Sequence, residues 1–202
     1  MAFIYFITHP NVLIDPAVPV PEWPLSSRGR QRMLALAAQP WVWNLGAVWC
    51  SIEQKAIDGA EILAAAIGTI PRPMAMLGEN DRSATGYLPE AEFEATADIF
   101  FARPHDSVRG WEKAIDAQQR IVQAIQAVLA ETRAGLDIAV VSHGAVGTLL
   151  LCWLKGCAIS RTEDQPGNGG GNWYCFDRET YSLLHGWHPI EHPHRATGPT
   201  IQ

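Results

Sequence analysis

Hydrophobic residues in this chain alternate between short apolar runs and longer segments of helical spacing. Residues 2–8, 46–51 and 138–142 are runs of strand length that contain aromatic or β-branched side chains. Apolar positions follow a helical stripe over residues 53–67 and again over residues 111–134. Strands that alternate with helices in this way predict a mostly parallel sheet between two layers of helices.

Capping and helix-breaking residues set further boundaries. Ser26 or Ser27 is a suitable N-cap for a helix that extends to about Ala38. The prolines between residues 10 and 24 exclude regular helix or central strand before it. A further helix is expected over residues 145–154, directly after the third apolar run.

The last third of the chain predicts an antiparallel edge. Residues 172–176 and 181–185 are two strand-like segments joined across residues 177–180, and they follow a Gly-rich turn at residues 167–171. The expected fold class is therefore α/β, a three-layer α/β/α sandwich around a mostly parallel sheet with an antiparallel edge.

The periodicity weakens between residues 77 and 110. Glycine, proline and polar residues alternate there with the aromatic side chains of Phe93, Phe100 and Phe101. We expect this segment to be a small lid with short helices over the edge of the sheet. Residues 1–202 are then a single domain, which is an ordinary size for one hydrophobic core.

Composition and charge exclude several classes of partner. The chain is 48% hydrophobic and 18% charged, which is typical of a globular protein. A net charge of −6 without any lysine or arginine run argues against nucleic acid or an anionic membrane surface as a partner. The N-terminal apolar run is too short for a signal peptide and has no basic region before it, so a cytoplasmic location is expected.

Two of the predicted strands end in a histidine. Thr8-His9-Pro10 follows the first strand, and Ser142-His143-Gly144 follows the strand at residues 138–142. Ligands of open α/β sheets bind at the carboxyl ends of parallel strands, so both imidazoles can reach one small anionic group there. Two unrelated loop histidines are the alternative for either segment taken alone.

Four segments, in order and spacing, resemble the histidine phosphatase superfamily, in its phosphoglycerate-mutase-like branch. The resemblance covers about residues 1–155 and rests on Thr8-His9-Pro10, Leu25-Ser26-Ser27-Arg28-Gly29, Ser51-Ile52-Glu53-Gln54-Lys55-Ala56 and Ser142-His143-Gly144. It implies that His9 attacks phosphorus and becomes a phosphohistidine. It also implies that His143 lies beside the transferred group, where charge is spread over the equatorial oxygens.

The physical chemistry of these residue types agrees with such roles. A neutral imidazole is a good nucleophile near pH 7, and a covalent intermediate divides one difficult displacement into two easier ones. Ser142 and the start of the helix after Gly144 can add backbone N–H groups and the positive end of a helix dipole.

The sequence departs from the family pattern in its phosphate-binding cations. Thr8 stands where the family has an arginine before the nucleophile, and Lys55 replaces the second arginine. Arginine binds phosphate with a planar fork, whereas lysine is a mobile point charge. Losing one preorganised donor typically costs about 10²–10³ in rate. A compensating cation can come from Arg28, Arg82 or Arg103, with Arg28 in the segment that resembles a phosphate-pocket helix.

The leaving alcohol needs a proton donor. The resemblance assigns this role to Glu79, in a position after the third strand of the family, and Asp81 can share or take it. Crowded carboxylates raise each other's pKa, which suits a general acid. The alternative is a solvated acidic loop over residues 79–82 that is held by its own salt bridge.

Two other features allow a functional and a structural interpretation. His185, His188, His192 and His194 have spacings that zinc or copper can use, but two prolines break any helix that would align them, so a solvated tail is expected and no metal site is predicted. Trp41-Val42-Trp43 is expected to pack in the core, with a surface for a homodimer as the alternative.

The sequence thus predicts a phosphatase that acts through a phosphohistidine on a small phosphorylated molecule. His9, His143 and Glu79 are the expected catalytic residues, and Thr8, Lys55, Arg28 and Ser142 are the expected phosphate-binding residues. No metal or other cofactor is required. The alternative is a catalytically weak or inactive relative that binds a phosphorylated ligand or a protein partner.

Overall fold

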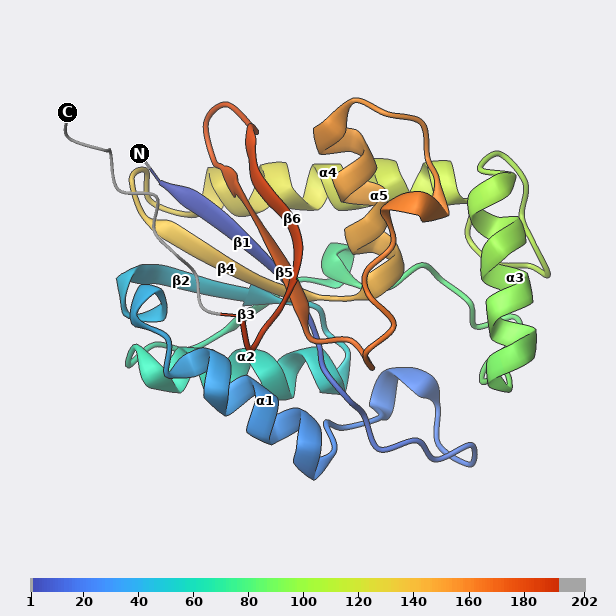
Figure 1. Cartoon of the computed structure of the whole chain (residues 1–202), viewed down its shortest axis with the longest axis horizontal. Helices are drawn as coiled ribbons and strands as arrows, with labels where there is room; N and C mark the ends of the chain where they lie inside the picture. Colours follow the sequence, from blue (N-terminus) through green and yellow to red (C-terminus); the bar gives the residue numbers. More distant parts are fainter. Residues whose placement is uncertain (1, 193–202) are drawn as a thin grey trace.

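The computed structural model describes residues 2–192, which form a sheet of six strands covered by helices on both faces (Figure 1). The strands lie in the order β3-β2-β4-β1-β5-β6. Their bounds are β1 (Phe3–Thr8), β2 (Leu45–Cys50), β3 (Arg72–Pro73), β4 (Asp137–Ser142), β5 (Asn172–Asp177) and β6 (Leu183–Pro189). The first four run parallel and the last two form an antiparallel edge, which confirms the predicted fold class.

The described part of the chain contains five α-helices. They are α1 (Ser27–Ala37), α2 (Gln54–Ala66), α3 (Glu90–Ala102), α4 (Ala114–Glu131) and α5 (Gly144–Lys155). Short 3₁₀ turns occur at η1 (Val20–Glu22), η2 (Pro40–Asn44), η3 (Ala75–Leu77) and η4 (Arg161–Glu163). Helices α1 and α2 cover one face of the sheet, and α4 and α5 cover the other (Figure 1).

Strand β1 shows why the apolar runs are continuous. Ile4 and Phe6 pack with α4 and α5, whereas Tyr5 and Ile7 pack with α1 and α2. Successive side chains of a strand point to opposite faces, so a strand buried on both faces is apolar at every position. Because β1 lies at the centre of the sheet, its carboxyl end is held from both sides.

The start of α1 is fixed by the predicted cap. The hydroxyl of Ser26 accepts a hydrogen bond from the backbone N–H of Gly29 at 3.1 Å, and the backbone N–H of Ser26 donates to the Asn11 carbonyl. A Cβ on Gly29 would lie 2.1 Å from that same carbonyl oxygen. The segment after β1 therefore packs directly on the first turn of α1, which only glycine permits.

The structure differs from the expected pattern in two places. The segment at residues 77–110 holds one full helix, α3, instead of several short ones, and Phe100 and Phe101 are buried against α4 and α5. The edge strand β3 has only two residues, which is too short to show any periodicity, and Pro73 is tolerated there because it lies at a sheet edge. None of the helices within residues 2–192 has the length and apolar character needed to cross a membrane.

Candidate functional site

Parallel pairing of β1 with β4 brings the two strand-end histidines together. Thr8 lies opposite Ser142 in the register, and the backbone N–H of His9 donates to the Ser142 carbonyl at 3.0 Å. The rings of His9 and His143 are 5.2 Å apart between centroids and meet edge to face, with 69° between their planes. Two residues separated by more than 130 positions therefore share one end of the sheet.

The hydrogen bond of the His9 ring decides its tautomer. Nδ1 lies 3.0 Å from the carbonyl oxygen of Pro10, and a carbonyl can only accept, so Nδ1 carries the hydrogen. Burial lowers the pKa of His9 to about 4, with Lys55 contributing in the same direction. At neutral pH the ring is therefore uncharged, and Nε2 keeps a free lone pair.

His143 is more deeply enclosed. Its side chain is 1% exposed, and Nε2 lies 3.3 Å from Oε1 of Glu53. The alignment is not that of a hydrogen bond, and neither ring nitrogen has a hydrogen-bond partner within the described residues. Burial lowers its pKa well below the usual value, against the opposing effect of Glu53. A phosphoryl oxygen at this nitrogen would compete with the Glu53 carboxylate, which already lies against it.

Glu53 is the central group that sequence reasoning missed. Its Oε2 accepts from Nζ of Lys55 at 2.5 Å, and its Oε1 accepts from the backbone N–H of Glu79 at 3.1 Å. Burial would raise the pKa of this carboxyl, but His143 and Lys55 outweigh it and the pKa falls to about 2. A full negative charge therefore lies among groups that would otherwise bind an anion. The only signal in the sequence is an acidic residue two positions before Lys55.

Lys55 faces this carboxylate and not an open site. Its side chain is buried, and Nζ also donates to the Val20 carbonyl at 2.8 Å. Burial lowers the pKa of Lys55, while Glu53 opposes that effect. The structure thus places the predicted phosphate-binding lysine in the site but pairs its charge with Glu53.

None of the three other predicted phosphate ligands lines either cavity of this site. The Thr8 hydroxyl lies 2.8 Å from Oε1 of Gln165, to which it donates, and the Ser142 hydroxyl donates to the Leu77 carbonyl at 2.8 Å. Both side chains are buried. Arg28 is exposed on α1 and lines neither cavity of the site.

Glu79 caps helix α5. Its carboxyl oxygens accept from the backbone N–H groups of Ala145 at 3.2 Å and Val146 at 3.1 Å. Burial raises its pKa, although Arg82 and these N–H groups oppose the rise. The helix terminus that the sequence offers to a phosphate is therefore occupied by a carboxyl group of the chain. Asp81 is exposed, and hydrogen bonds from Ser83 lower its pKa, which does not suit a general acid.

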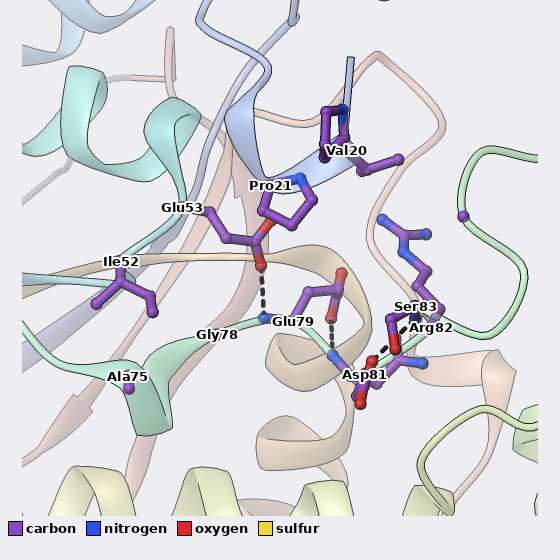
Figure 2. A pocket seen from close by; sticks show the side chains of 13 residues that line it. Val20, Pro21, Ile52, Glu53, Ala75, Gly78, Glu79, Asp81, Arg82 and Ser83 are labelled. Atoms are coloured by element: carbon purple, nitrogen blue, oxygen red, sulfur yellow. Dashed lines mark hydrogen bonds between the residues drawn. The ribbon is translucent and has the colours of Figure 1, made fainter. Parts of the chain in front are cut away.

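Two cavities meet at this end of the sheet. One encloses about 590 Å³ and is lined by His9, Glu79, Arg82 and Gln165 among others. The second encloses about 490 Å³ and shares Glu79 and Arg82 with the first (Figure 2). Of the three expected compensating cations only Arg82 lines them, and its guanidinium lies 5.0 Å from the ring centroid of Phe93.

The histidine-rich segment lies apart from this site, near Trp173. The rings of His185 and His188 are 4.5 Å apart, and those of His188 and His192 are 4.9 Å apart. Among residues 2–192 no three His, Cys, Asp or Glu side chains form a group that could hold a metal ion. His194 lies outside the described residues.

The fold and site define an α/β protein that presents two uncharged imidazoles and a buried carboxyl group at the carboxyl ends of its central strands. Residues 17–185 match the family model of the histidine phosphatase superfamily (branch 1), and the chain belongs to this family. Membership supports a phosphatase-type activity. The matched range contains Glu53, Lys55 and His143 but begins after Thr8 and His9.

Solved structures share the fold at low sequence identity. Bacillus stearothermophilus YhfR is 20% identical with a TM-score of 0.77, over 92% of this chain and 95% of that one. A mycobacterial glucosyl-3-phosphoglycerate phosphatase is 17% identical with a TM-score of 0.69, over 93% of this chain and 96% of that one. The α-ribazole phosphatase from Shigella flexneri is 18% identical with a TM-score of 0.66, over 90% of this chain and 93% of that one. No curated protein matches the chain.

Proposed function

We propose that this protein hydrolyses a small phosphate monoester through a covalent phosphohistidine at His9. The observation that carries the proposal is the tautomer of His9. Because Nδ1 donates to the Pro10 carbonyl, the Nε2 lone pair is free, and the ring lines a cavity large enough for a small ester. Family membership and the phosphatases that share the fold support the same reaction class.

The reaction balances with groups that line this cavity. Nε2 of His9 attacks phosphorus, the bond to the bridging oxygen breaks, and the protonated carboxyl of Glu79 donates its proton to the leaving alcohol. The Glu79 carboxylate then takes a proton from water, whose oxygen attacks phosphorus. The P–N bond breaks, phosphate leaves, and both residues return to their starting states. The raised pKa of Glu79 favours the protonated form that the first step needs.

Charge stabilisation in this site is weaker than two arginines would supply. Arg82 is a cation that both cavities share, and Lys55 becomes available only when Glu53 releases it. Each lost preorganised donor typically costs about 10²–10³ in rate. We therefore expect a slow enzyme, with a smaller rate acceleration than an arginine-rich pocket provides.

One observation favours a second candidate, a relative that binds a phosphorylated ligand or a protein partner without turnover. The Glu53 carboxylate already contacts Lys55 and lies against His143, so the chain's own anion satisfies this site. Binding alone would require neither the nucleophile His9 nor the buried acid Glu79. Because the chain retains both, we favour hydrolysis.

Turnover and covalent labelling separate the two candidates. Hydrolysis of 4-nitrophenyl phosphate should resist EDTA and disappear in His9→Ala, while the matched variant His185→Ala should keep the rate of the parent protein. Rapid acid-free quenching should show a phosphoryl adduct on His9 by mass spectrometry. Turnover that His9→Ala retains would refute the proposed nucleophile, and EDTA-sensitive turnover would refute the proposed mechanism. Micromolar phosphate-ester binding without turnover or adduct would establish the binding candidate.

A further inference from the structure

The second cavity differs from the first in the chemistry of its walls. It encloses about 490 Å³, and most of the surface it exposes is apolar. Val20 and Pro21, from the segment after β1, lie on one side, and Ile52 and Ala75 lie on the other (Figure 2). Pro19 also lines the cavity. Small-molecule sites are typically concave, mostly apolar and about 300–1,000 Å³ in volume, so this cavity is of the right size and kind.

Its polar groups gather where it joins the His9 cavity. Glu79 and Arg82 line both cavities, and Figure 2 shows Arg82 on the opposite side from Ile52, with the Glu53 and Glu79 carboxyl groups between them. A phosphate ester with its phosphorus near His9 can therefore extend past Glu79 into the apolar space. In that pose the bridging oxygen lies beside the carboxyl group that would protonate it.

Asn80 adds one unsatisfied polar group to the cavity wall. The residue is 3% exposed, and its amide nitrogen has no hydrogen-bond partner within residues 2–192. Buried polar groups are nearly always paired, so an acceptor atom on a ligand is the missing partner that this amide would take.

We propose that this cavity binds the alcohol part of the substrate, and that this alcohol is a predominantly apolar group of about ring size with at most one or two acceptor atoms. The inference rests on the proposed hydrolysis at His9. A polyhydroxylated alcohol such as a sugar is disfavoured, because its hydroxyl groups would lose water against carbon-rich walls without gaining partners.

Two esters of similar leaving-group chemistry test the proposal. 2-Phenylethyl phosphate and glycerol 1-phosphate both release a primary alcohol, and we expect kcat/KM to be at least about tenfold higher for the first. Ile52→Asn places an amide in the cavity wall and should reduce that preference about tenfold. Ile70→Asn is the matched control, because Ile70 is likewise an exposed isoleucine but lines neither cavity. Equal kcat/KM for the two esters, or equal preferences in both variants, would overturn the inference.

A binding measurement keeps this inference separate from the proposed hydrolysis. Ligand-observed NMR should detect 2-phenylethanol on the parent protein, on Ile70→Asn and on His9→Ala, with a signal that is lost in Ile52→Asn. If neither ester is turned over, the proposed hydrolysis fails. The NMR signals of 2-phenylethanol on these variants then decide by themselves whether the cavity binds an apolar alcohol. Binding that Ile52→Asn leaves unchanged would place the alcohol elsewhere and refute the inference.

Discussion

Oε1 of Glu53 lies 3.3 Å from Nε2 of His143, and the same carboxylate bonds to Nζ of Lys55. His143 and Lys55 are two of the residues that the family resemblance expects to contact the phosphoryl group. A carboxylate and a phosphoryl group both present oxygen atoms with negative charge, so they compete for the same donors. The resting site of this protein is thus filled by an anion of its own chain.

Removal of that charge should open the site to phosphate. Glu53→Gln keeps the size of the side chain but removes the negative charge, and a charge about 4 Å away is worth several kcal/mol at an effective dielectric constant of about 20. We expect inorganic phosphate or vanadate to bind at least about tenfold more tightly, as measured by calorimetry. Glu61→Gln, on the exposed side of α2, should leave the affinity unchanged. An unchanged affinity in Glu53→Gln would show that Lys55 and His143 do not form the anion site.

Glu79→Gln should slow the reaction in a way that depends on the leaving group. Loss of a general acid typically costs about 10²–10⁴ in rate, so hydrolysis of an alkyl phosphate should fall within that range. Hydrolysis of 4-nitrophenyl phosphate should fall far less, because nitrophenolate leaves without a proton. Asp81→Asn is the control and should alter neither rate by more than a few fold. Equal losses for both esters would assign Glu79 a structural role as the cap of α5.

Thr8→Val should affect stability more than catalysis. The Thr8 hydroxyl donates to Gln165 and accepts from the backbone N–H of Asn172 at 3.0 Å. Its removal leaves the buried Asn172 N–H without this acceptor, whereas Oε1 of Gln165 keeps Nδ2 of Asn172 as a donor. Such a loss costs about 1–3 kcal/mol in the free energy of unfolding, which urea denaturation measures. Thr69→Val, at an exposed position, should change it by less than about 0.5 kcal/mol. A large loss of phosphate affinity at unchanged stability would instead place the Thr8 hydroxyl on the ligand.

The pH dependence follows from the directions of the pKa shifts. Activity should fall below about pH 4 as His9 is protonated, and it should fall again on the alkaline side as Glu79 passes through its raised pKa. Stability should also decrease on acidification. Between the unfolded pKa of 6.5 and the folded value of about 4, the unfolded state binds the proton on His9 and the folded state does not.

The acid loss of stability can be assigned by mutation. The His9 contribution is up to about 3 kcal/mol, fully present above pH 6.5 and lost as the pH falls to about 4. His9→Ala should therefore flatten the dependence of unfolding free energy on pH in this window, whereas exposed His105→Ala should not. If the unfolding free energies of His9→Ala and the parent protein changed with pH in parallel, the lowered pKa of His9 would be contradicted.

Local sequence was sufficient for most of the fold and for one relationship within the site. The apolar runs, the Ser26 cap and the helical stripes specified strands and helices, because burial and backbone hydrogen bonding depend mainly on residues close in sequence. The two predicted strands that end at His9 and His143 also implied that these histidines converge, since parallel strands in one sheet must end on the same edge.

The state of the site was decided only by tertiary structure. Whether Thr8 faces a ligand depends on Gln165, which is 157 positions away, and whether Lys55 is free depends on the direction of the Glu53 side chain and on the Val20 carbonyl. Arg28 in turn lies on the exposed face of α1. Residue types specify which contacts a side chain is able to make, but the charge left over for a ligand is determined by the packing of groups that are distant in sequence.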